Sequence, residues 1–267
     1  MKRIFCLLSL ALSLNPLCAQ ERLRLATTTS VQDSGLLPHL LAHFEKKCGC
    51  RVDVIAVGSG QALKLAANGD VDMVLVHDPA SEEKFVRDGY GVDRRTFMVN
   101  DFVILGPASD PTRIRGTKDA ARAFARIRES RSHFISRGDA SGTHQKEKHF
   151  WKKAGIEPAG RWYLDIGQGM GAVLTMADEK GGYTICDRAT YLTRMQQLKL
   201  QVLVEGDPDL INYYSLIRVH PQRFPALKHR RSRQLIDWLC SADGQRLIGG
   251  YTANGHALFK PAYVPGK

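Results

Sequence analysis

The sequence lacks most features that would place it among membrane, redox or repeat proteins. Its one long apolar run, from Ile4 to Leu14, is shorter than the roughly 20 residues that a permanent membrane helix needs. It contains no internal repeat, no low-complexity tract and no CxxC pair. Hydrophobic residues make up 43% of the chain and charged residues 24%, values that are ordinary for a soluble globular protein and argue against disorder.

The first residues have the layout of a secretory signal peptide. Lys2 and Arg3 give a positive start, the apolar run follows, and a break with the small residue Ala19 comes after it. We expect cleavage after Ala19, so that residues 1–19 are a signal peptide and the mature protein lies in the periplasm. A lipid anchor on Cys18 is the less favoured alternative, because the three residues before it have no small side chain.

Positive charge exceeds negative charge, with 38 Lys and Arg against 27 Asp and Glu, a formal net charge of +11 and a pI near 9.5. The net charge falls by two, to +9, when the leader is removed. This excess favours anionic partners. Nucleic acid is not predicted as a partner, because the dense basic cluster at 228–233 has no interleaved aromatic residues on which bases would stack. A solvated helix face explains that cluster.

Four cysteines remain after the leader: Cys48, Cys50, Cys186 and Cys240. At least one disulfide is expected in an oxidising compartment. Cys48 and Cys50 are too close in sequence for an easy bridge to each other, so we expect pairing with Cys186 or Cys240, and the sequence leaves open which pair forms. No Cys and His spacing matches a zinc or redox site, so neither a metal nor a cofactor is predicted.

Strand-like and helix-like segments alternate along the mature chain, which indicates an α/β protein. About 250 residues fit two lobes of roughly 100 to 150 residues each. We expect the chain to cross to a second lobe near Phe102–Leu105 and to return near Tyr213–Ile217. Lobe 1 would then comprise 20–102 and 216–267, and lobe 2 would comprise 103–215. Two such crossovers form a hinge that closes a cleft on a ligand; a single domain with a long insertion is the alternative.

Three loops lie between a strand and a helix and are rich in hydroxyls and free backbone N–H groups: 27–30 (TTTS), 58–60 (GSG) and 137–143 (RGDASGT). Ligands of open α/β sheets bind beyond the carboxyl ends of strands, and helix N-termini there favour anions. Helix capping or a tight turn explains each loop taken alone. Arg137 sharpens the third loop, because a guanidinium binds an oxyanion through two hydrogen bonds. An ion pair with Asp139 is its alternative role.

These residues resemble the periplasmic tungstate-binding proteins of ABC transporters. The matching stretches are ATTTSVQDSG (26–35), VGSGQALKL (57–65), GDVD (69–72), VHDP (76–79) and SRGDASGTH (136–144), with NDF (100–102), WYL (162–164) and GQGMG (167–171) as further matches. They extend to about Arg188 and so cover most of the chain. The loop from Arg137 to Thr143 is also similar to phosphate-binding proteins of the wider superfamily.

The resemblance implies a two-lobed type II periplasmic binding protein fold whose hinge consists of two crossover strands. It also implies a tungstate held as an oxyanion through hydrogen bonds and delivered to a membrane permease, with a monomeric binding protein as the default. Carried over residue by residue, it assigns ligand-binding roles to Thr28, Thr29, Ser30, Ser59, Arg137, Ser141, Gly142 and Thr143, with Gly169 as a nearby contributor. Ser59 stands where many relatives carry Thr, and it keeps the hydroxyl.

Molybdate, phosphate and sulfate are the alternative ligands. Tungstate is fully ionised at neutral pH and only accepts hydrogen bonds, whereas phosphate retains a proton and rewards an acceptor. Asp78 and Asp139 therefore decide between them. If either carboxylate points into the site, phosphate is favoured; if both turn away, a proton-free dianion such as tungstate, molybdate or sulfate is favoured.

Two alternatives lie outside oxyanion transport. A hydrolase with Ser141 or Thr143 as nucleophile and His144 as base is not favoured, because adjacent residues at a helix start rarely face each other and no carboxylate is placed to orient the histidine. His144 and His149 are five apart and do not match a helical zinc motif. We therefore predict a binding protein without catalytic residues. A sensory binding module that signals without transport is the second of these alternatives.

Overall fold

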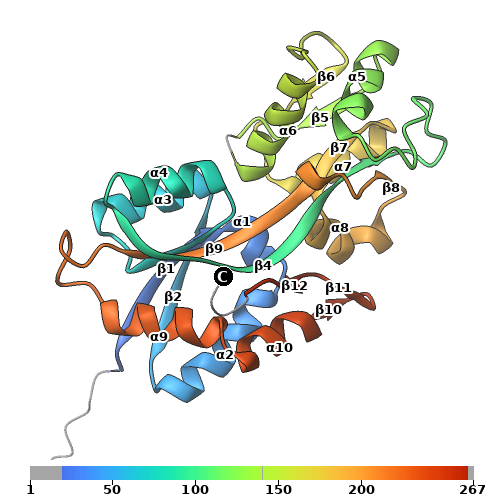
Figure 1. The fold of residues 1–267 in the computed structure, drawn as a ribbon. Helices are drawn as coiled ribbons and strands as arrows, with labels where there is room; N and C mark the ends of the chain where they lie inside the picture. Colours follow the sequence, from blue (N-terminus) through green and yellow to red (C-terminus); the bar gives the residue numbers. More distant parts are fainter. Residues whose placement is uncertain (1–19, 140, 264–267) are drawn as a thin grey trace, which may run out of the picture.

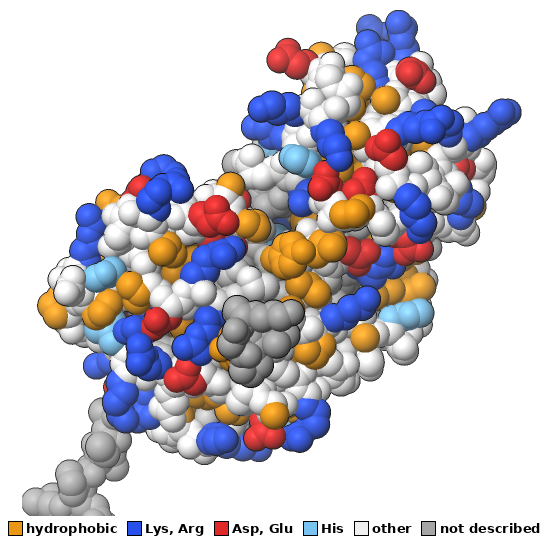
Figure 2. Space-filling view, viewed as in Figure 1, with side chains coloured by type: hydrophobic (Ala, Val, Ile, Leu, Met, Phe, Trp, Pro, Cys, Tyr) orange, Lys and Arg blue, Asp and Glu red, His pale blue; other side chains and the backbone are white. Residues whose placement is uncertain are grey.

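The computed structural model describes residues 20–139 and 141–263, which form two lobes joined by two long strands (Figure 1). The predicted signal peptide, with Cys18, lies outside the described residues. Within the described ranges, no helix is long and apolar enough to cross a membrane. Basic side chains are spread over both lobes on the face shown in Figure 2, with acidic side chains among them.

The first lobe contains a mixed sheet with the strand order β12–β4–β9–β3–β1–β2. The parallel strands are β1 (Arg22–Thr28), β2 (Arg51–Val57) and β3 (Met73–Val76), and the antiparallel ones are β4 (Gly91–Gly106), β9 (Ile211–Val219) and β12 (Lys260–Pro261). Because β1, β2 and β3 run the same way, their carboxyl ends meet at one edge of the sheet. The loops that follow β1 and β2 are two of the three that the sequence singled out.

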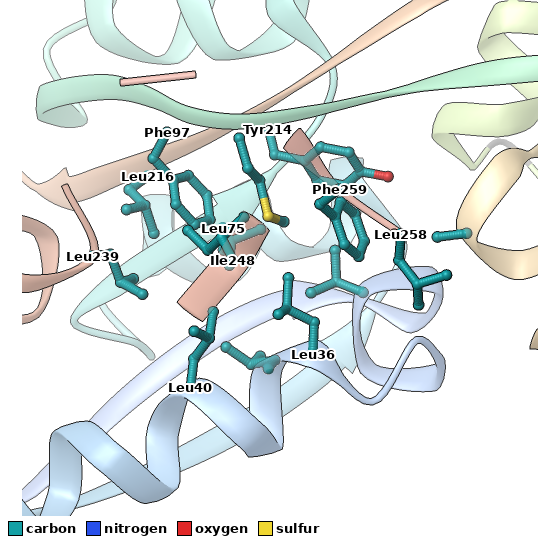
Figure 3. Packing of buried hydrophobic residues seen from close by; sticks show 14 of the residues in the cluster. Leu36, Leu40, Leu75, Phe97, Tyr214, Leu216, Leu239, Ile248, Leu258 and Phe259 are labelled. Atoms are coloured by element: carbon teal, nitrogen blue, oxygen red, sulfur yellow. The ribbon is translucent and has the colours of Figure 1, made fainter. Parts of the chain in front are cut away.

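Helices cover both faces of this sheet. Figure 1 shows α3 (Ser59–Asn68) and α4 (Pro79–Arg87) on one face, and α2 (Leu36–Cys48), α9 (His229–Leu239) and α10 (Ala242–Gly250) on the other. The predicted apolar stripe of α2 is confirmed, since Leu36, Leu40 and Phe44 are each 1% exposed. In Figure 3, Leu36 and Leu40 lie across from side chains of the sheet such as Leu75. A short helix, α1 (Thr29–Asp33), follows β1 directly.

The second lobe consists of α5 (Ala120–Ser130), β5 (Phe134–Ser136), α6 (Gly142–Lys153), β6 (Tyr163–Asp165), α7 (Met170–Lys180), β7 (Thr184–Asp187), α8 (Arg188–Arg194) and β8 (Gln201–Val204). Its core is aromatic, because Phe124, Phe134 and Trp151 are at most 2% exposed and their rings contact one another. Two 3₁₀ turns, Met195–Gln197 and Pro208–Leu210, lie near β8. The hairpin β10 (Thr252–Ala253) and β11 (His256–Ala257) follows α10.

The predicted α/β class and the two crossover strands are confirmed. β4 and β9 pair from Gly91 with Val219 to Asp101 with Ile211, and from Phe102 onward β4 pairs with β7 and β8 instead. The sequence indicated only the last four residues of β4 before Gly106, because charged residues interrupt the apolar pattern of its first half. Of these, Arg94 forms an ion pair with Glu82, which holds that half in place.

The predicted disulfide pairing is wrong, because Cys48 is bridged to Cys50. Gly49 between them ends α2 with a left-handed backbone, φ +62°, and this turn brings the two Cα atoms to 5.2 Å, within the usual span of a disulfide. A separation of only two residues in the sequence predicts that such a bridge is difficult, and the turn at Gly49 overcomes this. Cys186 and Cys240 are free and buried.

The short bridge leads to a test of stability. A loop of three residues is expected to stabilise the folded protein by only about 1.6 kcal/mol, whereas a link from Cys48 to Cys186 would contribute about 5 kcal/mol. We therefore expect urea unfolding with and without a thiol reductant to give free energies that differ by about 1.6 kcal/mol. The variant Cys48→Ala should show no effect of the reductant. A difference near the larger value would contradict the observed pairing.

Candidate functional site

The three loops meet in one small cavity between the lobes. Its volume is about 10 Å³, and it is lined by Thr28, Thr29, Ser30, Val57, Gly58, Ser59, His77, Arg137, Ser141, Gly142 and Thr143. Eight of the nine residues predicted from the sequence thus lie together. Gly169 lies instead on an adjoining cleft of about 580 Å³, to which Arg137 and Ser141 also contribute. The cleft adjoins the cavity, since both are also lined by Thr29, Ser30, Val57 and Gly58.

The loop after β1 is fixed by its hydroxyls. Thr27 Oγ1 donates to the carbonyl oxygen of Leu75 at 3.0 Å, which holds the loop against β3. Thr28 caps α1 by accepting from the Val31 amide at 3.4 Å, and its Oγ1 lies 3.1 Å from Ser30 Oγ. Thr28 and Ser30 thus share one hydrogen bond, which leaves further hydroxyl donor and acceptor capacity on this wall of the cavity.

Ser59 begins α3 and is 2% exposed. Among the described residues its Oγ has no hydrogen-bond partner, although the atom is buried. The preceding residue, Gly58, provides no side-chain cap for the helix. A buried hydroxyl without a partner costs about 1–3 kcal/mol, and a helix N-terminus attracts negative charge. Both facts favour an anionic acceptor at this point of the cavity.

The second lobe contributes Arg137, which follows β5 and is 7% exposed. Gly138 makes the turn after it with φ +62°, and a Cβ at that position would collide with the Asp165 carboxylate. Ser141 then caps α6 by accepting from the backbone N–H of His144 at 3.3 Å. This loop therefore presents a guanidinium and the first turn of a 12-residue helix to the same cavity.

Neither of the two carboxylates that decide the ligand class lines the cavity. Asp139 accepts from Arg137 Nε at 3.0 Å and from the Ser141 amide at 3.1 Å. Burial acts to raise the pKa of Asp139, but hydrogen bonds from Ser141 and Arg137 outweigh it and hold the pKa below its usual value. Asp78 caps α4 and accepts from Ser81 Oγ at 2.6 Å. Arg137 thus forms the ion pair with Asp139 that was its alternative role, and it also lines the cavity.

His77 is a cavity residue that the sequence analysis did not select. It follows β3, is 6% exposed, and its Nδ1 lies 3.1 Å from Asn212 Oδ1. Burial lowers the pKa of His77, against the attraction of Asp187. The signal for it was present: the VHDP stretch (76–79) follows a strand at the same sheet edge as the other loops. Val57 and Gly58 are further lining residues that were not selected.

Glu147 supports the Arg137 loop from behind. Its carboxylate accepts from Ser136 Oγ at 2.7 Å, Trp151 Nε1 at 3.0 Å and Tyr163 Oη at 2.8 Å. Burial nevertheless raises the pKa of Glu147 to about 7, because these hydrogen bonds only partly offset the loss of water around the charge. The residue immediately before Arg137 is therefore tied to α6 through a buried carboxyl group.

In the described part of the chain, no group of three or more His, Cys, Asp or Glu side chains is placed to hold a metal ion. The cavity offers hydroxyls, amides and a guanidinium, which are hydrogen-bond donors toward an anion.

Comparison with known proteins agrees with this geometry. Residues 19–243 match the family model described as PBP superfamily domain. The chain is 44% identical over 247 residues to the tungstate-binding protein TupA of Peptoclostridium acidaminophilum, covering 91% of this chain and 86% of that protein. It is 36% identical to TupA of Campylobacter jejuni, with 86% of this chain and 87% of the relative covered.

Two solved structures are similar along their whole length. The tungstate-binding protein TupA from Desulfovibrio alaskensis G20 matches with a TM-score of 0.81 and 42% identity, covering 91% of this chain and 100% of that one. The tungstate ABC transporter structure from Geobacter sulfurreducens matches with a TM-score of 0.79 and 50% identity, covering 86% and 99%. The similarity therefore includes both lobes and both halves of the cavity.

The contact between His77 and Gly142 yields a prediction on packing. A Cβ at position 142 would lie 2.8 Å from His77 Cε1, whereas a Cβ at position 169 would meet nothing within 4 Å. Gly142→Ala should therefore lower the free energy of unfolding by about 1–3 kcal/mol. Gly169 is the N-cap of α7, so Gly169→Ala should lower it by less, about 0.5–1 kcal/mol, which is the cost of an alanine cap. Thermal unfolding of both variants is the measurement. Equal effects would argue against close packing of the lobes here.

The raised pKa of Glu147 yields a prediction on pH. The folded protein holds this proton up to about pH 7, above the ordinary value of 4.5, so its contribution to stability is complete below 4.5 and is lost as the pH rises to 7. Compared with wild type, Glu147→Gln should gain up to about 3 kcal/mol of stability over this range. Urea unfolding at several pH values measures it, and the exposed Glu157→Gln is the control. A constant difference across the range would contradict the prediction.

Proposed function

We propose, from the premise that this chain belongs to the PBP superfamily and within it to the family of the tungstate-binding proteins TupA, that it captures tungstate for an ABC transporter. Like its relatives, the chain is a binding protein and not an enzyme. Its ligand is an oxyanion held by hydrogen bonds, and its partner is the membrane permease that receives the oxyanion. No cofactor takes part in this function.

The ligand-binding residues in this proposal are Thr28, Thr29, Ser30, Ser59, Arg137, Ser141, Gly142 and Thr143, with Gly169 at the mouth of the cavity. The observation that carries the assignment is the buried Ser59 hydroxyl, which lacks a partner among the described residues and lies in the same cavity as Arg137. A tetrahedral anion would give both groups an acceptor. The two residues come from different lobes, so one anion would bridge them.

The choice of a proton-free dianion rests on the carboxylates. Asp78 and Asp139 accept from neighbouring donors and do not line the cavity; Asp139 lines the adjoining cleft, where its carboxylate is held by Arg137 and Ser141. Tungstate, molybdate and sulfate fit this arrangement better than phosphate does. Within that set, tungstate is proposed because the relatives are named as tungstate-binding proteins. Molybdate, sulfate or phosphate is the alternative ligand.

Binding is proposed to involve a small movement of the lobes, which we assign as 20–102 with 216–267 and 103–215. The cavity of about 10 Å³ is close to the smallest space that holds one water molecule, and an anion with four oxygens is larger. The loops of the two lobes must therefore separate slightly as it enters. The crossing strands β4 and β9 are where such a movement would be centred.

The setting of this function is proposed to be the periplasm. The support is the signal-peptide pattern of residues 1–19 together with the relatives, which are named as tungstate-binding proteins. A monomer docking on its permease is the proposed working unit.

Thermal melting in the presence of different oxyanions tests the proposal. Tungstate at about 100-fold above its Kd should add roughly 2.7 kcal/mol of stability, which for a chain of this size raises the Tm by roughly 5–10 °C. Arg137→Ala should abolish the shift, because the desolvated anion loses its guanidinium partner. Each shift is measured against the same variant without anion.

The matched control is Arg161→Ala, an exposed arginine of the same lobe outside the cavity, which should keep the full shift. A shift with phosphate alone would replace tungstate by the alternative ligand. No shift with tungstate, molybdate, sulfate or phosphate would rule out the proposed function.

A further inference from the structure

His77 also lines the cavity, and the proposed function assigns no role to its two ring nitrogens. The side chain is 6% exposed, and its ring stacks on Tyr214 with the ring centres 4.9 Å apart. On one side, Nδ1 lies 3.1 Å from Asn212 Oδ1. On the other side, the ring faces Gly142, where a Cβ would lie 2.8 Å from Cε1, 3.2 Å from Nδ1 and 3.4 Å from Nε2. His77 lines the cavity, and Nε2 is the ring nitrogen that Asn212 leaves available to it.

The orientation of the Asn212 amide decides which nitrogen of His77 carries the proton. Asn212 Nδ2 lies 3.1 Å from Asp187 Oδ2, and also 3.1 Å from Asn100 Oδ1 and 2.8 Å from Tyr214 Oη. A carboxylate and a carbonyl oxygen only accept, so the NH₂ group must face them. Reversing the amide would place its oxygen against both. Asn212 Oδ1 therefore faces His77, and Nδ1 must be the nitrogen that donates.

Asp187 is fixed in the same network. It is 2% exposed and accepts from Asn100 Nδ2 at 2.7 Å, from Tyr214 Oη at 2.7 Å and from the Thr190 amide at 3.0 Å. These donors come from β4, β9 and the first turn of α8. A switch of the His77 tautomer would require the Asn212 amide to turn and give up its hydrogen bonds to Asp187, Asn100 and Tyr214, because Nδ1 without a proton would leave two acceptors facing each other at Asn212.

A neutral His77 with its proton on Nδ1 has a lone pair on Nε2 and no proton there. No hydrogen bond from a described residue reaches Nε2. A fully ionised oxyanion also offers only lone pairs, so a neutral His77 would repel it. The ring becomes a donor toward the anion only by binding a second proton.

We propose that His77 is an anion-binding residue that takes up one proton when a dianion enters the cavity. The proton comes from solvent and adds to Nε2, the bond from Nδ1 to Asn212 is kept, and Nε2–H donates to an oxygen of the anion. No bond of the anion is broken, and the complex holds one proton more than the free partners. This inference rests on the proposed function and adds a ligand residue and a proton to it.

The charges around His77 explain why the proton arrives with the ligand. In the free protein, burial is the largest influence on the ring and lowers the pKa of His77; Asp187 and Asp78 raise it, and Arg137 lowers it. The uncharged neighbour Tyr214 stacks on the ring. A dianion beside Nε2 adds two negative charges at close range and raises the pKa. Binding should therefore be tighter at lower pH, between the pKa values of the free and occupied protein.

The same geometry separates two kinds of oxyanion. Hydrogen phosphate has a proton of its own and would donate it to the neutral Nε2, so its binding would need no proton from solvent. Tungstate has none at neutral pH and would need one. Proton uptake would thus accompany tungstate but not phosphate, although both are tetrahedral.

Titration calorimetry with tungstate in two buffers of different ionisation enthalpy measures the protons taken up per anion. Between the pKa values of His77 in the free and in the occupied protein, we expect uptake to approach one proton, and the Kd to fall by at most about tenfold per unit decrease in pH. His77→Gln keeps an amide that donates a hydrogen bond but does not titrate. It should bind tungstate without proton uptake and with a Kd that is independent of pH. His133→Gln, an exposed histidine outside the cavity, is the control and should behave as wild type.

The possible outcomes are distinct. Wild-type protein that binds tungstate without proton uptake, or His77→Gln protein that keeps the uptake, would overturn the role of His77. Wild-type protein that binds no tungstate at any pH would overturn the proposed function instead. If His77→Gln does not fold, histidine ring NMR of the wild type decides: the pKa of His77 must rise when tungstate is added, and an unchanged value would overturn the inference.

Discussion

The antiparallel pairing of β4 with β9 is the contact on which both lobes depend. It runs from Gly91 with Val219 to Asp101 with Ile211, and β4 then continues into the second lobe to pair with β7 and β8. One strand is thus part of two sheets. Because the main-chain hydrogen bonds of a ladder tolerate bending and twisting, the lobes can change their angle while every strand keeps its partners.

The second constraint is electrostatic. A cavity that collects amides, hydroxyls and a guanidinium from several loops is costly to bury unless each polar group finds a partner. Arg137 meets Asp139, and the hydroxyls of Thr28 and Ser30 meet each other, whereas the Ser59 hydroxyl has no partner among the described residues. Of the nearby carboxylates, Asp78 is held by Ser81 outside the cavity, and Asp139 is held by Arg137 and Ser141, which line it. The protein therefore keeps these acceptors occupied and directs spare donors to one point.

Much of this could be predicted from the sequence, because the relevant signals are local. The stripe of α2 and the three loops that end strands follow from side-chain spacing and from the chemistry of Thr, Ser and Gly. Other features depend on contacts between distant residues. The first half of β4 is hidden by charged residues whose partners, such as Glu82 for Arg94, are set by tertiary packing. The bridge from Cys48 to Cys50 depends on the backbone of Gly49, and His77 shows its position only once β3 and α6 meet.

The division of the donors between two lobes has a consequence for the lifetime of the complex. In the proposed complex the anion lies between Ser59 and Arg137, so its release requires these two residues to separate. The dissociation rate is then governed by how often the lobes open rather than by the strength of any one hydrogen bond. A docking partner that holds the lobes apart would shorten the residence time of the anion without touching a single residue that binds it.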